Sequence, residues 1–550
     1  MTVDTLDVDL LTPIDRYLAG QADMTVVDRF AQRHAATLPD QARYYRDVVP
    51  VERPSPGQQY GFEVDLDACT GCKACVTACH NLNGLGSGES WRSVGLMHAG
   101  SEAAPRQQSV TSGCHHCVDP ACMKGCPVNA YEKDAVTGIV VHLDDQCIGC
   151  RYCVLTCPYE VPRYNADLGI VRKCDLCTGR LAAGEAPACV QSCPNAAIRV
   201  SLVDVASAVS AAAAGPLVPG APASVITVPT TLYRSARALP EAAPSASSTR
   251  SIAPGQSHPP LAVMLVLTQL AVGVALVGLA GRALAPPVLV DALRPATAAV
   301  ALAAGIVALA ASVCHLGRPL YAFRALLGLR CSWLSREIAA FVAFAVLTAG
   351  HGWALLIDAG RPVEPVLATS AVLVGVVGVG CSALVYTVTR RAWWALPRTV
   401  AKFALSSLAL GSAAMLVATL ASAAVIGGAD GARTQAVLGR PLALVVAGVI
   451  TVKLAAEAFF LLRHRRAGAP AELRRSALLL VGPLGVGTRR RFAAGVAAAV
   501  LTSALRVAGA SRTVALVLAG AGFVALVGGE LLERWQFFTA AAPARMPDGR

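Results

Sequence analysis

Sixteen of the 19 cysteines of this chain lie between Cys69 and Cys193, in four groups with short and regular spacing. The groups are Cys69, Cys72, Cys75 and Cys79; Cys114, Cys117, Cys122 and Cys126; Cys147, Cys150, Cys153 and Cys157; and Cys174, Cys177, Cys189 and Cys193. Residues 1–11 are acidic and carry no cationic segment ahead of an apolar run, so we expect no secretory signal peptide. Without export to an oxidising compartment, this density of cysteine favours metal ligation over a disulfide framework.

The spacing within the groups indicates which kind of metal centre the cysteines bind. Two groups have the run C-x2-C-x2-C-x3-C, and three end in Cys-Pro. In bacterial ferredoxins, three closely spaced thiolates of such a run bind one cluster and the fourth binds its neighbour. The cysteines therefore predict four [4Fe–4S] clusters. We also expect the fourth cysteine to begin a short helix, because the proline after it is compatible with the first turn of a helix. Structural zinc is the alternative, but zinc requires neither the compact run nor the proline.

The C-terminal half has the composition of a membrane domain. The chain is 55% apolar and only 15% charged, whereas about a quarter of the residues in an average soluble domain are charged. From Pro259 onward, long apolar runs alternate with arginine-bearing loops. Each run reaches or nearly reaches the roughly 20 residues that a helix needs to cross the hydrocarbon core. The eight predicted spans are about 260–281, 292–313, 337–357, 366–388, 403–427, 438–462, 492–510 and 513–532.

The two halves also differ in charge. Residues 1–257 have 20 Lys and Arg against 25 Asp and Glu, whereas residues 258–550 have 27 against 10. The arginines lie between apolar runs, which is typical of membrane flanks, so we expect no nucleic-acid partner. With eight spans, the loops on the side of the cysteine-rich unit hold 16 Lys and Arg, and the opposite loops hold 7. The positive-inside rule then predicts a multi-pass protein of the inner membrane with its cysteine-rich unit on the cytoplasmic side.

These patterns predict a chain of several units. The fold class is an α+β ferredoxin-like double dicluster domain followed by an all-α polytopic membrane domain of about eight helices. Residues 1–58 are a helical extension with apolar positions at Leu18, Val26, Val27 and Phe30, residues 59–200 are the cluster domain, and residues 201–258 are a linker rich in Ala, Pro and Ser. Residues 259–540 are the membrane anchor, and residues 541–550 are a tail.

The order and spacing of all four cysteine groups resemble the iron–sulfur subunit of dimethyl sulfoxide reductase-type molybdoenzymes. The stretches that carry the resemblance are DACTGCKACVTACHNLNG, VTSGCHHCVDPACMKGCPVNAYEKDAVTGIV and DDQCIGCRYCVLTCPYEVPRYN. The resemblance implies that groups one and four share two clusters and that the two middle groups share the others. The implied ligand sets are Cys69, Cys72, Cys75 and Cys193; Cys174, Cys177, Cys189 and Cys79; Cys114, Cys117, Cys122 and Cys157; and Cys147, Cys150, Cys153 and Cys126.

A second resemblance lies in the membrane half. CHLGRPLYAFRALLGLRCSWLSREIA (residues 314–339) and GELLERWQFF (residues 529–538) are similar to segments of the membrane anchor of the same enzymes. The chain thus resembles a fusion of two subunits. The resemblance implies a quinone site at His315 and Glu337, with Arg318 as a further candidate that either neutralises Glu337 or faces anionic lipid. From position alone, His315 and Glu337 would instead be interfacial anchors.

Two other features of the anchor bear on its chemistry. Lys453 and Glu457 lie four residues apart in the sixth predicted span, so we expect them to pair, for structure rather than for proton conduction. Only His315, His351 and His464 follow residue 259, which is too few for two bis-histidine haems. A single haem would need His315 and His351, both near span ends, so we expect no haem.

The resemblances imply a non-catalytic subunit that passes electrons between the quinone pool and a separate molybdopterin-containing catalytic subunit. No molybdopterin-binding domain is evident in the sequence, so the substrate chemistry belongs to that partner. Reduction of an S- or N-oxide and oxidation of an oxyanion such as sulfite both stay open. The alternatives are an electron-transfer subunit of a formate dehydrogenase or nitrate reductase type and, more remotely, a zinc-stabilised membrane scaffold without a redox role.

Overall fold

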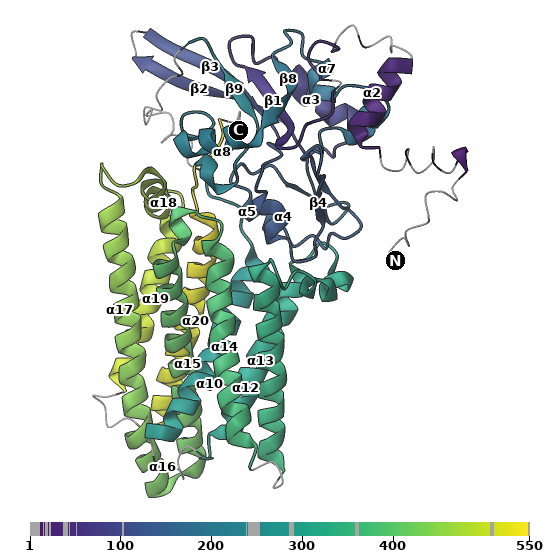
Figure 1. The fold of residues 1–550 in the computed structure, drawn as a ribbon. Coiled ribbons are helices and arrows are strands. Elements are labelled where there is room, and N and C mark those ends of the chain that lie inside the picture. Colours follow the sequence, from purple (N-terminus) through teal and green to yellow (C-terminus); the bar gives the residue numbers. More distant parts are fainter. Residues whose placement is uncertain are drawn as a thin grey trace.

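The computed structural model divides into an α+β domain and a bundle of long helices (Figure 1). It describes the chain except residues 1–11, 15, 17–19, 21–23, 37–41, 43–44, 51, 102–103, 238, 240–252, 285, 287–290, 358–361, 506–510 and 548–550. The predicted fold class, a ferredoxin-like domain followed by a helical membrane domain, is therefore confirmed.

The α+β domain is built on one small sheet and three hairpins. Strand β1 (Gln58–Asp65) pairs antiparallel with β8 (Ile198–Asp204) and parallel with β9 (Leu232–Arg234). The hairpins join β2 (Ser93–Ser101) to β3 (Ala104–Ser112), β4 (Tyr131–Lys133) to β5 (Val140–His142), and β6 (Arg163–Asn165) to β7 (Ile170–Arg172). Because the central strand joins residues from both ends of the domain, it closes the fold around the cysteines between them.

Short helices carry the cysteine groups. They are α3 (Ala74–Leu82), α4 (Ala121–Gly125), α5 (Tyr152–Thr156), α6 (Thr178–Ala182) and α7 (Ala188–Gln191). The expected position of the Cys-Pro pairs is wrong for all three, because Cys126 and Cys157 end α4 and α5, Cys193 lies two residues beyond the end of α7, and no helix begins at any of them. The following proline is compatible with this end, because it cannot continue the helix.

The segments on either side of the cysteine-rich region pack onto it. In α2 (Val26–Ala36), Val27 and Phe30 are buried as the apolar pattern predicts, whereas Leu18 lies outside the described residues. The predicted linker is partly ordered, with α8 (Val205–Ala214) and the 3-10 turn η3 (Ser224–Ile226). Both segments therefore cover the cluster domain.

The anchor is a helical bundle. Its helices are α10 (Pro259–Leu284), α12 (Arg294–Cys314), α13 (Trp333–Leu356), α14 (Glu364–Thr387), α15 (Leu396–Ile426), α16 (Gly428–Thr434), α17 (Arg440–His464), α18 (Ala471–Val481), α19 (Gly485–Ala504) and α20 (Arg512–Thr539). Three short segments connect them: η4 (Pro319–Leu326), η6 (Ala392–Trp394) and the π-turn η7 (Gln435–Gly439).

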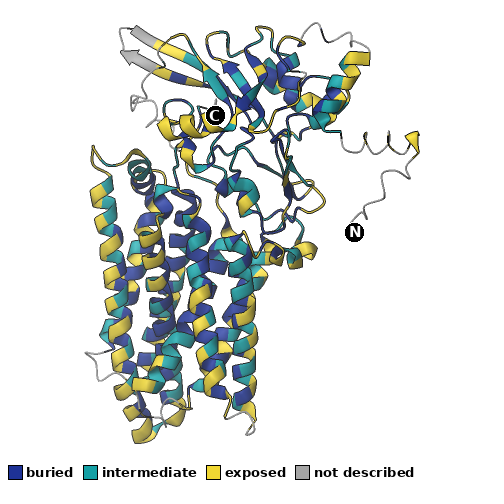
Figure 2. Ribbon diagram, viewed as in Figure 1, coloured by how far each residue is buried: buried dark blue, intermediate teal, exposed yellow. Residues whose placement is uncertain are grey.

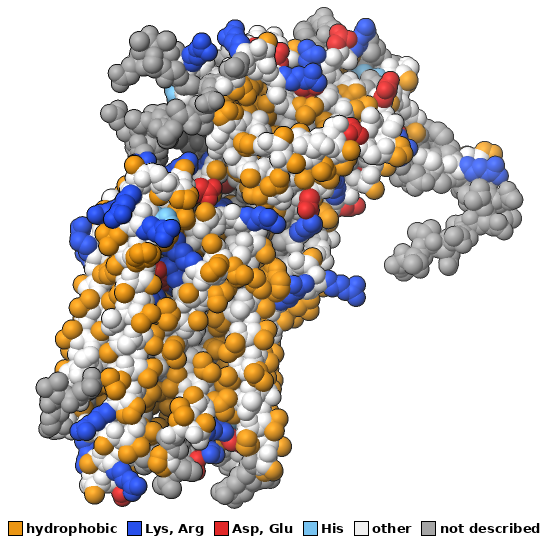
Figure 3. All heavy atoms as spheres, turned by 60° about the vertical axis from the view of Figure 1, so that its left-hand side comes forward, with side chains coloured by type: hydrophobic (Ala, Val, Ile, Leu, Met, Phe, Trp, Pro, Cys, Tyr) orange, Lys and Arg blue, Asp and Glu red, His pale blue; other side chains and the backbone are white. Residues whose placement is uncertain are grey.

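In the described part of the chain, seven helical segments are long and apolar enough to cross a membrane, one fewer than the eight predicted. The difference is α19, which begins before the predicted 492–510 span and so includes Arg489, Arg490 and Arg491 in its first turns. Figure 2 colours many residues on the outside of the bundle as exposed, and the face seen in Figure 3 is largely hydrophobic, with Lys and Arg gathered toward the bundle ends. Such an apolar girdle requires lipid around it.

The last residues return to the α+β domain. Met546 is buried against Val64 and Leu66 of that domain. Arg545 pairs with Glu160 at 3.3 Å, and the Ala544 amide donates to Glu472 beside the bundle. The chain therefore connects the two halves at both ends of the anchor.

Seven buried charged side chains hold α15, α17, α19 and α20 together. They are Lys402, Lys453, Glu457, Arg491, Glu530, Glu533 and Arg534. Lys453 pairs with Glu530 at 2.5 Å, and Lys402 pairs with both Glu457 (2.5 Å) and Glu533 (2.6 Å). The expected Lys453–Glu457 pair is thus wrong: each finds its partner on another helix, because buried charges must be compensated wherever the bundle brings them together.

We predict that Lys453→Met destabilises the detergent-solubilised protein by about 3–5 kcal/mol, because it leaves Glu530 buried without its cation. Thermal unfolding measures this effect. Arg465→Met, at an exposed loop position, is the matched control and should unfold like the wild type. Adding Glu530→Gln to Lys453→Met should recover part of the loss; equal unfolding of all four proteins would contradict the role of the ion network.

Candidate functional site

A cavity of about 300 Å³ lies where the α+β domain meets the helical bundle. Its walls come from the loop around Cys150, from the start of α10, from the end of α12, and from α13, α14 and η4. Phe323, Val313 and Val342 line it and are also exposed on the outside of the bundle, by 70%, 36% and 43%. The cavity therefore extends from a predicted cluster ligand to the surface that faces lipid.

Two of the three predicted quinone-site residues line this cavity. His315 follows the last residue of α12, and Glu337 lies in the second turn of α13. Both are buried, at 7% and 3% exposure. The ring of His315 hydrogen-bonds the backbone of Cys150, while its Nε2 atom has no partner among the described residues. The Glu337 carboxylate accepts a hydrogen bond from Ser382 of α14.

Arg318 is not among the residues that line the cavity. Its guanidinium donates to the backbone carbonyl of Asp144 at 2.9 Å, and Arg324 donates likewise to Asp145. Neither alternative considered for Arg318, neutralising Glu337 or facing lipid, describes this contact. Arg318 instead connects the loop after α12 to the α+β domain.

Close backbone contacts hold the two halves together beside the cavity. The amides of Gly317, Arg318 and Gly328 donate to the carbonyls of Gly149 (3.4 Å), Ile148 (3.1 Å) and Pro127 (2.7 Å). A Cβ atom at Gly317 would lie 2.0 Å from the Gly169 carbonyl oxygen. Glycine is therefore required at position 317 for this approach.

The thiols that raise one another's pKa lie mostly within the ligand sets that the resemblance implies, but Cys75 also acts on Cys79 and Cys189, and Cys114 acts on Cys174. Counted from the cavity outward, the implied sets are Cys126, Cys147, Cys150 and Cys153; Cys114, Cys117, Cys122 and Cys157; Cys79, Cys174, Cys177 and Cys189; and Cys69, Cys72, Cys75 and Cys193. In the described part of the chain, no three His, Cys, Asp or Glu side chains could hold one metal ion. An iron–sulfur cluster does not require three ligands around one ion, because its several iron atoms are bound by four thiolates that lie further apart.

The local backbone around these thiols suits cluster binding. The first and third groups have the same left-handed positions, at Gly71 and Lys73 and at Gly149 and Arg151. Backbone amides also donate to the sulfur atoms of Cys126 (3.3 Å), Cys147 (3.4 Å) and Cys193 (3.3 Å). Hydrogen bonds to cluster sulfurs are one means by which proteins set reduction potentials. Free thiols with amides directed at them fit [4Fe–4S] clusters.

Buried polar side chains connect successive sets. Tyr131 interacts with Cys153 and Cys122, Lys173 with Cys122 and Cys174, and Arg92 with Cys174 and Cys75. The sets therefore follow one another from the cavity, where Cys150 forms part of the wall, to the last set, where Cys72 is exposed.

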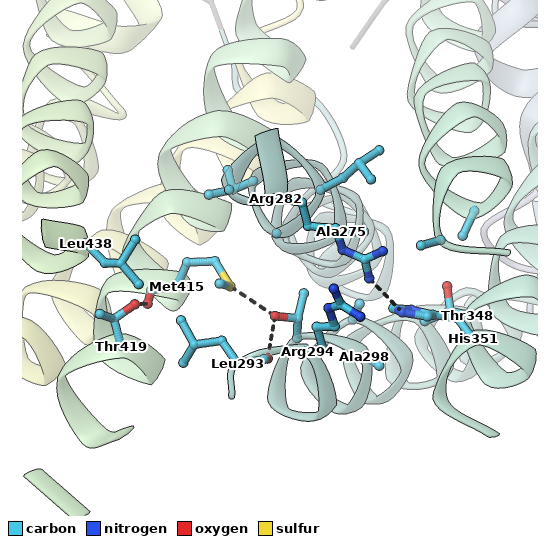
Figure 4. A pocket seen from close by; sticks show the side chains of 18 of the residues that line it. Ala275, Arg282, Leu293, Arg294, Ala298, Thr348, His351, Met415, Thr419 and Leu438 are labelled. Atoms are coloured by element: carbon cyan, nitrogen blue, oxygen red, sulfur yellow. Dashed lines mark hydrogen bonds between the residues drawn. The ribbon is translucent and has the colours of Figure 1, made fainter. Parts of the chain in front are cut away.

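A second, smaller cavity of about 90 Å³ lies toward the other end of the bundle (Figure 4). The Nε2 atom of His351 lies 3.3 Å from a guanidinium nitrogen of Arg282, the contact drawn in Figure 4, and 2.7 Å from a carboxylate oxygen of Glu364. His351 lies 14 residues beyond Glu337 on α13, about 21 Å along the helix axis. His315 and His351 are thus too far apart to ligate one haem.

Comparisons with known proteins match both halves of the chain. A family model described as a 4Fe-4S dicluster domain matches residues 106–202, and one described as the DMSO reductase anchor subunit (DmsC) matches residues 254–458. The probable anaerobic dimethyl sulfoxide reductase subunit YnfG of Escherichia coli is 43% identical over 155 residues, which are 26% of this chain and 75% of that protein. The chain belongs to the dimethyl sulfoxide reductase iron–sulfur subunit family. It joins this subunit to a DmsC-family anchor in one polypeptide.

The chain is also similar to two further iron–sulfur subunits. The B subunit of the anaerobic dimethyl sulfoxide reductase of Haemophilus influenzae is 38% identical over 156 residues, 27% of this chain and 76% of the relative. The formate dehydrogenase iron-sulfur subunit of the same organism is 36% identical over 153 residues, 25% of this chain. The match spans only about half (49%) of the formate dehydrogenase subunit. The dimethyl sulfoxide reductase-type subunits are thus the better covered.

Sequence reasoning missed one residue of the site, His258. It precedes α10 by one residue, lines the main cavity, and is only 6% exposed. The first apolar run begins at Pro259, so the histidines of the apolar half do not include it. The sequence signal that could have identified His258 is its position directly before the first predicted span.

We predict that Gly317→Ala destabilises this fused reductase subunit by about 1–3 kcal/mol, because the added methyl group overlaps backbone atoms at the junction of the two halves. Thermal unfolding in detergent tests this. Gly448→Ala, in α17, is the control, because no atom lies within 4 Å of the added Cβ. Equal unfolding temperatures of the two variants would show that the backbone contact is dispensable.

Proposed function

We propose that the chain is the membrane-bound electron-transfer subunit that links the quinone pool to a separate molybdopterin-containing catalytic subunit through four [4Fe–4S] clusters. The observation that carries the proposal is the main cavity, whose wall contains the predicted quinone residues His315 and Glu337 together with the predicted cluster ligand Cys150. A quinone bound there would lie against the first cluster.

The proposed cluster ligands are the four sets of cysteines that the resemblance implies, and the proximity of thiols within each set supports them. When bound, the clusters supply one-electron carriers between quinone and partner. The buried Lys173 and Arg92 place positive charge between successive sets. Such charge favours the reduced, more negative state of the neighbouring cluster.

His315, Glu337 and Arg318 have different roles in the proposed quinone chemistry. Oxidation of a quinol releases two electrons and two protons. The unpartnered Nε2 of His315 binds a quinol oxygen, and the Glu337 carboxylate accepts the first proton and releases it before it accepts the second. Quinone reduction reverses these steps. Arg318 is a positioning residue, because it fixes the loop that carries His315 to the α+β domain.

The outer end of the cluster domain is the proposed contact with the catalytic subunit. Cys72 of the last set is exposed, so a cluster there would lie near the surface. A partner docked at this end would receive or supply electrons over a short distance. For the membrane orientation, the excess of Lys and Arg in loops on the α+β side supports a cytoplasmic position of that domain in the inner membrane.

The direction of electron flow defines two candidate reactions. A terminal reductase of dimethyl sulfoxide reductase type would draw electrons from quinol. A dehydrogenase type, acting on sulfite or formate, would deliver them to quinone; the 36% identical formate dehydrogenase subunit supports keeping this second candidate.

We predict that low-temperature EPR of anaerobic membranes containing this chain and its catalytic partner shows interacting [4Fe–4S] signals with dithionite and with a menaquinol analogue. Signals with both reductants favour the terminal reductase, because quinol then has a path to the clusters. Signals with dithionite alone favour the dehydrogenase direction. Properly folded protein without any iron–sulfur signal would overturn the proposal.

We predict that Cys150→Ser interrupts the path at its first cluster. The quinol analogue should then fail to reduce the other three clusters, while dithionite still reduces them, because only the carrier beside the cavity is altered. Iron analysis should give fewer than the wild type's about 16 iron atoms per chain. Cys314→Ser, at an exposed anchor cysteine, is the control and should keep both reactions; quinol reduction that survives Cys150→Ser would remove the proposed route.

A further inference from the structure

We propose that His258 binds the quinone head group together with His315, so that two histidines from different segments hold one ligand. This inference rests on the proposed quinone function and adds a residue outside residues 314–339 and 529–538, the segments that the sequence singled out. His258 belongs to the approach to α10, whereas His315 follows α12, so the site forms only when both segments meet.

The geometry of the two rings supports a shared ligand. Both line the main cavity, and their ring centroids lie 5.3 Å apart with the planes nearly perpendicular, at 82°. The Nδ1 atom of His258 and the Nε2 atom of His315 are both buried and without a hydrogen-bond partner among the described residues. A buried polar atom left unpaired costs about 1–3 kcal/mol. A ligand oxygen in the cavity would remove this cost for both.

Three hydroxyl groups of the cavity are already engaged. The hydroxyl of Tyr152 donates to the Val385 carbonyl at 2.7 Å. Thr268 donates to the Met264 carbonyl and Ser312 to the Leu309 carbonyl. The unused hydrogen-bonding capacity of this largely apolar cavity therefore belongs to the two histidines and to Arg151, whose Nε is also buried without a partner among the described residues.

The ring of His258 is held in place by the chain around it. It packs edge-on against Phe538 at 5.3 Å, near the end of α20. The nearby Gly255 amide donates to the Thr539 carbonyl at 2.8 Å, and the Ala262 amide donates to the His258 carbonyl at 3.0 Å. A side chain fixed from both directions loses little further freedom when it binds a ligand.

The chemistry of the rings matches both redox forms of a quinone. Burial lowers the pKa of His258 to about 4, with Arg151 adding to the effect. A neutral imidazole carries one N–H donor and one acceptor nitrogen. Its tautomer decides whether the free nitrogen donates to a quinone carbonyl or accepts from a quinol hydroxyl.

The decisive experiment measures binding of a hydroxyquinoline N-oxide, a menaquinol analogue, by fluorescence quenching in membranes that contain the whole complex. His258→Phe retains an aromatic ring without ring nitrogens and should weaken binding about tenfold or more, as expected for loss of a buried hydrogen bond. His258→Gln, which keeps a donor and an acceptor, should lose less. His464→Gln, at the end of α17 and outside the cavity lining, is the control and should bind normally.

The outcomes separate this inference from the function on which it rests. Wild-type binding with an unchanged affinity of His258→Phe would overturn the role of His258 but leave the quinone site intact. Failure of the wild type itself to bind the analogue would overturn the proposed function. The dithionite-reduced EPR spectrum of each variant shows whether its cluster domain has assembled.

Photolabelling of the wild-type complex with an azidoquinone covers the case in which both variants fail to assemble. Because His258 and His315 line one cavity, the label should appear on the peptides that contain them. Labelling of the His315 peptide without the segment before α10 would count against His258.

Discussion

Backbone contact between the α+β domain and the anchor is the constraint on which the molecule depends. The loop after α12 hydrogen-bonds the backbone of the loop that carries Cys150, with glycine at the closest point. This contact brings a cysteine of a cluster group into the wall of a cavity that reaches lipid. The bundle, its ion pairs and the apolar girdle keep that wall at a fixed position in the membrane.

The fold and part of the site could be predicted because their signals are local in sequence. Cysteine spacing identified the cluster domain, and apolar runs identified most of the membrane helices. The partners of Lys453 and Glu457 could not be predicted, since they come from helices distant in sequence. Arg318 was a candidate for the quinone site because it lies near His315 in sequence, but its side chain points to Asp144.

His258 illustrates a different limit. A single histidine at the border of an apolar run has no spacing pattern, and its burial depends on contacts with Phe538 and His315 far along the chain. Likewise, α19 begins before its predicted span, because Arg491 can be buried in the bundle when Glu457 of α17 pairs with it, whereas Arg489 and Arg490 are exposed. Both cases require the three-dimensional arrangement.

The return of the C-terminal residues to the α+β domain gives the fused chain a property that separate subunits lack. The anchor is attached covalently through the segment before α10, and beyond α20 Met546 and Arg545 contact the α+β domain again. The covalent connection makes reassociation of the halves an intramolecular event with a high effective concentration. A modest interface therefore suffices to keep the halves together, even at dilutions at which two independent polypeptides would dissociate.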